Sequence, residues 1–242
     1  MNTRDGAFMK NSDLAEKICI NLLNKATRVY FGGILGASQS AMAHLLKQRG
    51  KLVAGCDQRA RSADAEAMRA AGIPIDPERQ PQLYAGDLVV YSLALGDDSP
   101  LFREARALEL HCISRAQLLG ALMAAYPRRV VVSGSHGKST TVGMLARILT
   151  VAGVDPTILG GAPLSIGGAH YRIGEQSLIL TEGCEYKDSF LSLSPTLGIL
   201  TNLEFDHPDY FPNMAALERS FIAFMRKCEQ VCVNIGCHNL SK

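Results

Sequence analysis

The sequence predicts an α/β protein with two parallel-sheet domains, of which the second is incomplete. From about residue 28 onward, short β-branched runs alternate with amphipathic segments, as expected when each helix crosses over to the next parallel strand. Tyr126-Pro127 interrupts the alternation, because proline disfavours helix at the residue before it. With 242 residues, the chain has room for one large or two medium domains, each with its own core.

Residues 1–27 are expected to form an N-terminal helical arm, with Leu14, Ile18 and Leu22 on its apolar face. This segment lacks the continuous apolar core of a signal peptide, and nowhere do about 18 apolar residues run together. The 25 Lys and Arg residues nearly balance the 23 Asp and Glu residues, which gives no electrostatic case for nucleic acid or an anionic membrane. We therefore expect a cytoplasmic protein with neither partner, and the sequence leaves open whether it forms a homo-oligomer.

The first domain is expected over residues 28–126 as a Rossmann-like parallel sheet. Its strands are predicted at "RVYF", "KLVAGCD", "DLVVYSLA" and "LHCIS", and its helices at "SQSAMAHLLKQRG", "SADAEAMRAAG" and "RAQLLGALMAAY". Gly50 and Gly72 follow the last periodic residues of their helices, where a glycine typically ends a helix. The pattern therefore sets both the order and the limits of the elements.

The stretch "FGGILGASQSAMA" (31–43) follows the first strand and opens a helix. Gly33, Gly36 and Ser38 could hold a diphosphate at the helix N-terminus, although a plain tight turn explains the glycines equally well. Asp57 ends the next strand, from which an acidic side chain can reach a ribose hydroxyl or cap a helix. These residues form a candidate nucleotide site with an open alternative.

The second domain is expected over residues 127–242. The strand "VVVS" leads through "GSHGKSTT" into a helix that is predicted to bury Val142, Leu145, Ala146 and Leu149 and to end at Gly153. A glycine-rich loop over 160–175 follows, and then the strands "SLILTE" and "LGILTN", a helix over 214–228 and the buried strand "QVCVN". A doubly wound nucleotide domain normally continues with further strands and helices, so this P-loop-type α/β domain is expected to be truncated.

The segment "GSHGKSTT" is the strongest chemical signal in the chain. A strict phosphate loop reads G-x-x-x-x-G-K-[ST], and here Val132 stands at the first glycine. The shorter motif keeps the same physics, since backbone N–H groups and a helix N-terminus face the phosphates, Lys138 adds a charge and the Ser139 hydroxyl can reach Mg²⁺. The residues predicted to bind ATP are Gly134, Ser135, His136, Gly137, Lys138, Ser139 and Thr140.

Two polar clusters follow the next predicted strands. Glu182 and Glu185 come just past "SLIL", and the second cluster, past "LGIL", comprises Asn202, Glu204, Asp206 and His207. Because the carboxyl ends of parallel strands meet at one edge of a sheet, both clusters are expected beside the lysine loop. Carboxylate and imidazole groups there could complete a Mg²⁺ site around a nucleotide, whereas each taken singly reads as a solvated loop charge.

The seven cysteines are scattered and odd in number, which is typical of reduced thiols rather than of a disulfide framework. The tightest group, in "CEQVCVNIGCH", places three cysteines and His238 within a short span. Its spacing fits no standard zinc pattern, so these residues are expected to be ordinary core thiols.

Three motifs together resemble those of the Mur ligases, ATP-dependent amino-acid ligases of peptidoglycan precursor synthesis. "GSHGKSTT" resembles the family's G-T-x-G-K-T-[ST] loop, "TEGCEYKDSFLSLSP" its E-x-x-E-x-x-x-S-F-L segment and "TNLEFDHPDYF" its T-N-[IL]-x-x-D-H-x-D-[YF] segment. The first glycine loop and "YSLALGDDSPLFREARALELHCISRAQLLGALM" add weaker similarity. In order and spacing the three motifs are specific, and the resemblance covers about residues 28–240.

The resemblance implies that ATP, with Mg²⁺, phosphorylates the carboxylate of UDP-N-acetylmuramate and that the amino group of L-alanine then attacks the acyl phosphate. It places Lys138 on the β and γ phosphates, and Ser139 with Glu182 on Mg²⁺. His207 would take a second Mg²⁺ or the acyl-phosphate side, with Asn202 lining the same site. The residues it assigns to the UDP sugar are Gly33, Gly36, Ser38, Asp57 and Ser92.

The sequence also departs from the family pattern. Leu35, Ser38 and Ala41 replace three glycines of the first loop, which is expected to hinder close approach of the backbone to a diphosphate. Part of the ATP domain and a whole third domain are expected to be absent, so the chain alone is expected to bind Mg·ATP weakly at most and to form no amide. The open alternatives are a non-catalytic nucleotide or UDP-sugar binding relative, a ligase that adds a preformed peptide, and an unrelated phosphate-loop ATPase or kinase, which "TNLEFDHPDYF" argues against.

Overall fold

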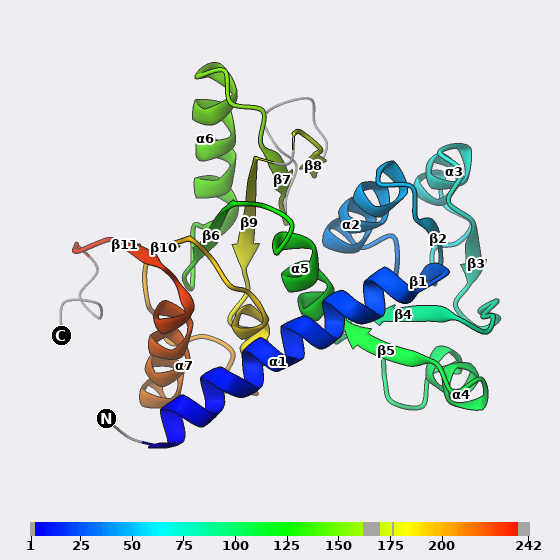
Figure 1. Cartoon of the computed structure of the whole chain (residues 1–242), viewed down its shortest axis with the longest axis horizontal. Coiled ribbons are helices and arrows are strands. Elements are labelled where there is room, and N and C mark those ends of the chain that lie inside the picture. Colours follow the sequence, from blue (N-terminus) through cyan, green and yellow to red (C-terminus); the bar gives the residue numbers. More distant parts are fainter. Residues whose placement is uncertain (1–2, 162–169, 176, 237–242) are drawn as a thin grey trace. The chain divides into compact units, whose positions relative to one another are not determined.

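A computed structural model describes residues 3–161, 170–175 and 177–236 of the chain (Figure 1). The chain divides into two compact units. The first comprises Ala15–Ala121, and the second comprises the described residues from Leu122 onward together with those before Ala15. None of the helices in this described part is both long enough and apolar enough to cross a membrane.

The N-terminal segment forms one helix, α1 (Thr3–Lys25), as the sequence predicts. The buried positions differ from those expected, because Leu14 and Ile18 are exposed whereas Cys19 and Leu23 are buried. Two apolar series with the same four-residue spacing overlap in this helix. Periodicity alone therefore could not identify the one that faces the interior.

The unit Ala15–Ala121 has the Rossmann-like fold that the sequence predicts. Its five strands are parallel and lie in the order β3-β2-β1-β4-β5. The strands are β1 (Arg28–Gly32), β2 (Leu52–Asp57), β3 (Ile75–Pro77), β4 (Asp87–Tyr91) and β5 (His111–Ser114), and the helices are α2 (Ala37–Gln48), α3 (Ala63–Ala70), α4 (Pro100–Ala107) and α5 (Arg115–Met123). The order reverses between β1 and β4, which is the position at which such sheets bind ligands. The short β3 and the helix α4 were not predicted.

A buried ion pair fixes the start of this sheet. Arg28 begins β1 and donates to both carboxylate oxygens of Asp87, which begins β4, at 3.0 and 2.6 Å. Asp87 also accepts from the backbone N–H of Tyr84 at 2.8 Å, and its side chain is 3% exposed. A fork-to-fork pair of this kind constrains geometry as well as supplying energy, so it sets the pairing of β1 with β4. The helix-ending glycines Gly50 and Gly72 have the expected positive φ, 81° and 74°.

The second unit contains a six-stranded sheet in the order β11-β10-β6-β9-β7-β8, parallel except for β8. The strands are β6 (Arg128–Ser133), β7 (Thr157–Leu159), β8 (Tyr171–Arg172), β9 (Leu178–Gly183), β10 (Leu197–Leu200) and β11 (Gln230–Val233), with α6 (Lys138–Val151), the 3₁₀ segment η1 (Tyr186–Ser192) and α7 (Met214–Lys227). The predicted strands and helices are present. Of the expected loop over 160–175, residues 162–169 lie outside the described residues.

The helices α6 and α7 pack on opposite faces of this sheet. Val142 and Ala146 of α6 form a core with Val132 and Leu180, against which Ile199 of β10 also packs. Gly198 directly precedes Ile199 on β10 and faces the other side of the sheet. A Cβ added at Gly198 would meet Phe224 and Cys228 at the end of α7. Because neighbouring residues of a strand face opposite ways, the two helices cover different faces.

Burial in this unit differs from the prediction in two places. Leu145 and Leu149 of α6 pack against the core as predicted, but they are only half-buried and border an open groove of about 530 Å³ beside Ile199. The strand β11 is exposed over Gln230–Cys232 because, among the described residues, it is the edge strand of the sheet and pairs with β10 alone. Cys228 is half-buried and Cys232 exposed, whereas Cys237 and His238 lie outside the described residues.

The outer face of α6 is also apolar. Met144, Ile148 and Val151 follow one another at helical spacing and are 55%, 61% and 70% exposed. They adjoin the side of the helix that carries Leu145 and Leu149, so one apolar surface runs from the groove to the solvent-facing side. We refer to Met144, Ile148 and Val151 as the α6 stripe.

Candidate functional site

The lysine loop joins the end of β6 to the start of α6. Gly134 has φ 138°, and a Cβ there would overlap the Thr201 hydroxyl and lie 3.0 Å from the Asn202 carbonyl oxygen. Gly137 has φ 81° and directly precedes the first helical residue, Lys138. Both positions favour glycine for steric reasons, and the turn that they allow brings the loop to the N-terminus of α6, whose first N–H groups have no partner within the helix.

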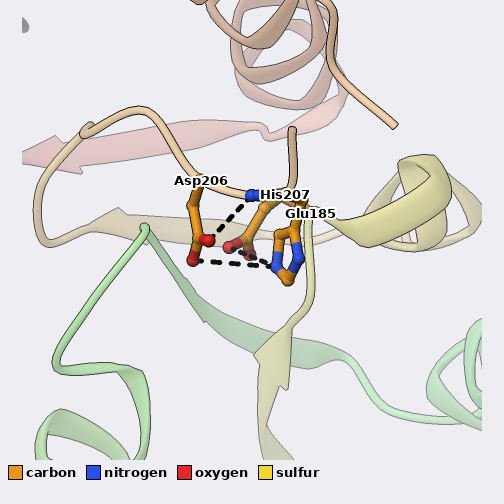
Figure 2. Close-up of side chains that lie close together, drawn as sticks. All are labelled: Glu185, Asp206 and His207. Carbon is orange, nitrogen blue, oxygen red and sulfur yellow. Dashed lines mark hydrogen bonds and ion pairs between the residues drawn. The ribbon is translucent and has the colours of Figure 1, made fainter. Parts of the chain in front are cut away.

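Three titratable side chains converge beside this loop from the ends of β9 and β10, the two strands that flank β6 (Figure 2). Glu185 follows β9, and Asp206 and His207 follow β10; their nearest ligand atoms all lie within 4.8 Å of one another. The imidazole Nε2 of His207 lies 3.6 Å from Glu185 Oε1 and 3.8 Å from Asp206 Oδ2. Two carboxylates and an imidazole form a donor set that can bind a divalent cation.

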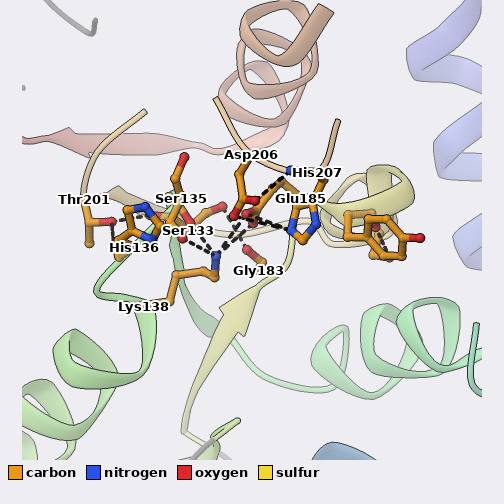
Figure 3. Close-up of polar contacts among 12 residues, drawn as sticks. Ser133, Ser135, His136, Lys138, Gly183, Glu185, Thr201, Asp206 and His207 are labelled. Atoms are coloured by element: carbon orange, nitrogen blue, oxygen red, sulfur yellow. Dashed lines mark hydrogen bonds and ion pairs between the residues drawn. The ribbon is translucent and has the colours of Figure 1, made fainter. Parts of the chain in front are cut away.

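Lys138 connects the loop to this cluster (Figure 3). Its ammonium donates to both carboxylate oxygens of Glu185, at 3.1 and 3.0 Å, and to the carbonyl oxygens of Gly134 at 2.5 Å and Ser135 at 3.2 Å. Glu185 is fully buried, and the Lys138 side chain is 17% exposed. A buried carboxylate requires a partner of opposite charge, so Lys138 and Glu185 depend on each other for their positions.

The segment after β10 is bonded to the lysine loop over several residues. The Asn202 side chain accepts from the His136 N–H and donates to the His136 carbonyl, both at 2.9 Å. The Ser135 hydroxyl donates to the Glu204 carbonyl at 2.7 Å and accepts from the Glu204 N–H at 2.9 Å. Thr201 donates to the His136 carbonyl at 2.7 Å. These bonds hold the loop against the strand end that leads to His207.

The structure separates the two glutamates at the carboxyl end of β9, because Glu182 is a residue of the strand and Glu185 follows it. The Glu182 carboxylate accepts from the backbone N–H of Gly161 at 2.8 Å, whereas Glu185 faces Lys138 and His207. Both glutamates and Asp206 belong to the polar clusters that were predicted to complete a Mg²⁺ site, and the resemblance assigned the metal to Glu182. Spacing could not separate the two glutamates, because both were expected just past the same strand. Asp206 joins the cluster, although the resemblance gave it no role.

The other predicted residues of this unit occupy the first turn of α6. Ser139 is half-buried and Thr140 is exposed, and both directly follow Lys138 at the helix N-terminus. His136 is exposed and lies 3.6 Å from the Glu204 carboxylate. The seven residues predicted to bind ATP therefore form one continuous loop and helix start.

Two tyrosines beside the cluster have raised pKa values. The Tyr210 hydroxyl donates to Asp188 at 2.6 Å, and this bond raises the pKa of Tyr210 to about 12. The Tyr186 hydroxyl donates to Asp209 at 2.8 Å, which raises the pKa of Tyr186 for the same reason. The ring of Tyr186 also lies 4.8 Å from the ring of His207. Both tyrosines therefore remain neutral donors at ordinary pH.

The unit Ala15–Ala121 has a cavity of about 420 Å³ at the carboxyl ends of its strands. Four of the five residues predicted to face the UDP sugar line it, namely Gly33, Gly36, Asp57 and Ser92. The fifth, Ser38, is not among the lining residues; its hydroxyl accepts from Arg115 at 3.0 Å. A second cavity, of about 1110 Å³, shares Asp57 and Arg59 with the first.

Asp57 stabilises the glycine loop. Its carboxylate accepts from the backbone N–H of Leu35 at 3.0 Å and of Arg59 at 2.9 Å, and Arg59 donates to the Leu35 carbonyl at 2.8 Å. Helix α3 is capped by Ser62 instead, so Asp57 is not a helix N-cap. Gly33 has φ 76°, which explains a glycine at that turn without a ligand.

Two models of one family match most of the chain. The Mur ligase family catalytic domain matches residues 28–127, and the Mur ligase middle domain matches residues 132–239. The chain is 39% identical over 203 residues to UDP-N-acetylmuramate–L-alanine ligase of Caldanaerobacter subterraneus subsp. tengcongensis, covering 84% of this chain and 44% of the relative. It is 37% identical over 223 residues to the ligase of the same name from Acetivibrio thermocellus, covering 92% and 47%.

The solved structures agree with these matches. The crystal structure of UDP-N-acetylmuramate-alanine ligase from Thermotoga maritima superposes with a TM-score of 0.78 at 27% identity, covering 87% of this chain and 49% of that one. The UDP-N-acetylmuramate:L-alanyl-gamma-D-glutamyl-meso-diaminopimelate ligase from Neisseria meningitides also gives 0.78, at 24% identity, and shares the fold. The chain spans about half the length of the curated relatives that it matches.

Proposed function

The chain belongs to the Mur ligase family, and from that premise we propose that it supplies the ATP-binding and UDP-sugar-binding parts of a ligase that joins L-alanine to UDP-N-acetylmuramate. The observation that carries the proposal is the contact of Lys138 with buried Glu185 at the start of α6, beside His207. In this proposal, the contact brings the lysine that binds phosphate together with the side chains that bind the metal, at one edge of the sheet. The reaction would be an ADP-forming step of peptidoglycan precursor synthesis.

In this proposal the lysine loop binds the phosphates of ATP. The residues concerned are Gly134, Ser135, His136, Gly137, Lys138, Ser139 and Thr140, whose backbone N–H groups and helix start favour anions. Lys138 would exchange its bonds to the Gly134 and Ser135 carbonyls for the β and γ phosphates. Its ammonium is already at the mouth of the loop, so only local rearrangement is needed.

We propose that Glu185, Asp206 and His207 hold Mg²⁺ with the Ser139 hydroxyl, and that Asn202 positions the loop beside them. Their donor set of two carboxylates and an imidazole fits a divalent cation, which would neutralise charge on the transferred phosphoryl group. The chain's own part is to fix Glu185 through Lys138 and to keep the His207 imidazole facing that carboxylate. Glu182, which is bonded to Gly161, would then support the neighbouring loop.

The UDP sugar is assigned to the unit Ala15–Ala121. The cavity lined by Gly33, Gly36, Asp57 and Ser92 lies at the carboxyl ends of the strands and has the volume of a small-molecule site. The larger neighbouring cavity would extend it enough for a nucleotide sugar. Ser38 would act indirectly, through its bond to Arg115. We assign residues 28–126 to this role, 127–242 to ATP and 1–27 to an N-terminal arm, and we place the reaction in the cytoplasm, where nucleotide-activated sugars and ATP are available.

Binding measurements on the whole chain test the proposal. Isothermal titration with Mg·ADP at millimolar ligand should give one weak site, in line with the weak nucleotide binding expected from the sequence, and titration with UDP-N-acetylmuramate should give one site. Lys138→Met should abolish the first and leave the second, and Gly33→Val should do the reverse, because these residues lie in different units. Lys17→Met, which removes an exposed lysine of α1, is the matched charge control. Loss of both ligands in either variant would indicate misfolding, and no heat from either ligand with the wild-type chain would refute the proposal.

A further inference from the structure

The loops that carry Glu185 and His207 are joined by two hydrogen bonds of the same kind. The Tyr186 hydroxyl donates to Asp209 at 2.8 Å, and the Tyr210 hydroxyl donates to Asp188 at 2.6 Å. Each loop therefore contributes one tyrosine and one aspartate. We name these contacts the crossed tyrosine–aspartate pairs, defined as Tyr186–Asp209 and Tyr210–Asp188.

The backbone on both sides of these pairs has an unusual conformation. Lys187, Asp188 and His207 have φ of 51°, 55° and 54°, in the left-handed region that residues other than glycine seldom adopt. Such conformations persist only where surrounding contacts impose them. These residues lie next to the site. On one loop, Lys187 and Asp188 are within three positions of Glu185, and on the other loop the residue concerned is His207 itself.

The Asp188 carboxylate has a further partner in the core. The hydroxyl of Ser220, a buried residue of α7, donates to its second oxygen. One carboxylate therefore bonds to a tyrosine from the His207 loop and to a helix packed against the sheet. Asp188 connects η1, the His207 loop and α7, and α7 in turn packs on Phe190 through Phe221 and Phe224.

We propose that the crossed tyrosine–aspartate pairs are positioning elements that hold Glu185 and His207 at metal-binding distance. The inference rests on the proposed function for the metal site, but the coupling of the two loops can be measured without it. Tyr186 and Asp188 occupy variable positions of the family's E-x-x-E-x-x-x-S-F-L segment, whereas Asp209 and Tyr210 fall on the D-[YF] positions of the T-N-[IL]-x-x-D-H-x-D-[YF] segment, which admits phenylalanine in place of the tyrosine. The pairs hold the two ligands through the loops, without touching the metal.

Metal affinity tests this role. In the whole chain with ADP present, Tyr210→Phe removes one donor and keeps the ring; Mn²⁺ affinity, read by electron paramagnetic resonance of the free ion, should fall about tenfold. The affinity of the same variant for ADP without metal should stay within about twofold of wild type. General loss of structure would instead lower both affinities. Tyr84→Phe, which alters an exposed tyrosine of the other unit, is the matched control and should change neither value.

Hydrogen exchange gives a second readout that does not depend on the metal. In Tyr210→Phe, exchange should accelerate at least about threefold in both segments 184–190 and 205–211. The double variant Tyr186→Phe with Tyr210→Phe should accelerate hydrogen exchange by less than the two single variants would together, because the two pairs restrain the same loops. Acceleration confined to 205–211, or unchanged Mn²⁺ affinity in Tyr210→Phe, would overturn the proposal. If the wild-type chain binds no Mn²⁺, the proposed metal site fails, and the exchange result alone decides whether the loops are coupled.

Discussion

Lys138 and Glu185 should contribute unequally to stability, although they form one pair. Lys138→Met leaves a fully buried carboxylate without its ammonium, whereas Glu185→Gln leaves Lys138 bonded to the Gly134 and Ser135 carbonyls. The lysine variant therefore removes the ammonium that bonds to both oxygens of a carboxylate with no access to water. The glutamine variant exchanges a charged acceptor for a neutral one of the same shape.

The magnitude follows from the geometry. At 3.0 Å and an effective dielectric constant of about 20, the pair attracts by about 5 kcal/mol before desolvation is subtracted. Removing one partner of a buried pair lowers the free energy of unfolding by about 3–5 kcal/mol. We expect about 3 kcal/mol for Lys138→Met, because the His207 imidazole stays 3.6 Å from the same carboxylate. For Glu185→Gln we expect the free energy of unfolding to fall by about 1 kcal/mol, because a hydrogen bond to a charged acceptor becomes one to a neutral acceptor. The difference of about 2 kcal/mol corresponds to about 30-fold in the folding equilibrium.

Urea denaturation followed by hydrogen exchange of separate segments provides the assay. With a slope of about 2 kcal/mol per molar, Lys138→Met should lower the midpoint of the lysine-loop unit by about 1.5 M and Glu185→Gln by about 0.5 M. The unit Ala15–Ala121 serves as an internal control whose midpoint should not move. A midpoint change below about 0.2 M for Lys138→Met, or equal changes for the two variants, would refute the reasoning.

Three further predictions follow from other contacts. Asp87→Ala should destabilise the unit Ala15–Ala121 by about 3 kcal/mol, because the Arg28 guanidinium loses the carboxylate that it pairs with and keeps a neutral acceptor, the Gln82 carbonyl; calorimetry should show no such loss for exposed Asp97→Ala. Gly134→Ala should prevent Mg·ADP binding even if the chain folds, since its Cβ would overlap Thr201, and unchanged affinity in titration would contradict this. Burial raises the pKa of the Cys228 thiol to about 11, so iodoacetamide labelling of Cys228, followed by peptide mass spectrometry, should accelerate about 100-fold from pH 7.5 to 9.5; an acceleration of only about 25-fold, which a thiol at its ordinary pKa would give, would argue against a buried thiol.

Much of the fold could be predicted because its signals are local. The glycines Gly50, Gly72 and Gly153 end helices with positive φ, and the strand–loop–helix order around Lys138 needs only the neighbouring residues to be recognised. The convergence of the lysine loop with the segment that holds His207 was also predictable, because parallel strands bring their carboxyl ends to one edge.

The details of the site depend on contacts that sequence spacing does not encode. Glu182 lies inside β9 and Glu185 lies just past it, a difference of three residues that the sequence pattern did not resolve; the Glu182 carboxylate bonds to Gly161, whereas that of Glu185 meets Lys138. For the same reason, a hydroxyl such as that of Ser38 could be assigned to a ligand although a distant arginine binds it. Burial of β11 was wrongly predicted because an apolar strand reads alike in the middle of a sheet and at its edge.

The α6 stripe affects how the purified protein associates in solution. Met144, Ile148 and Val151 present adjacent apolar surface to water beside the groove at Ile199, and within the part of the chain that the structure describes β11 is an edge strand of the same unit. Purified protein should therefore form concentration-dependent aggregates, more so at high sulfate, which strengthens apolar association. Replacing Ile148 with lysine should keep the protein monodisperse without touching the nucleotide loop, and would be a sensible first variant for crystallisation.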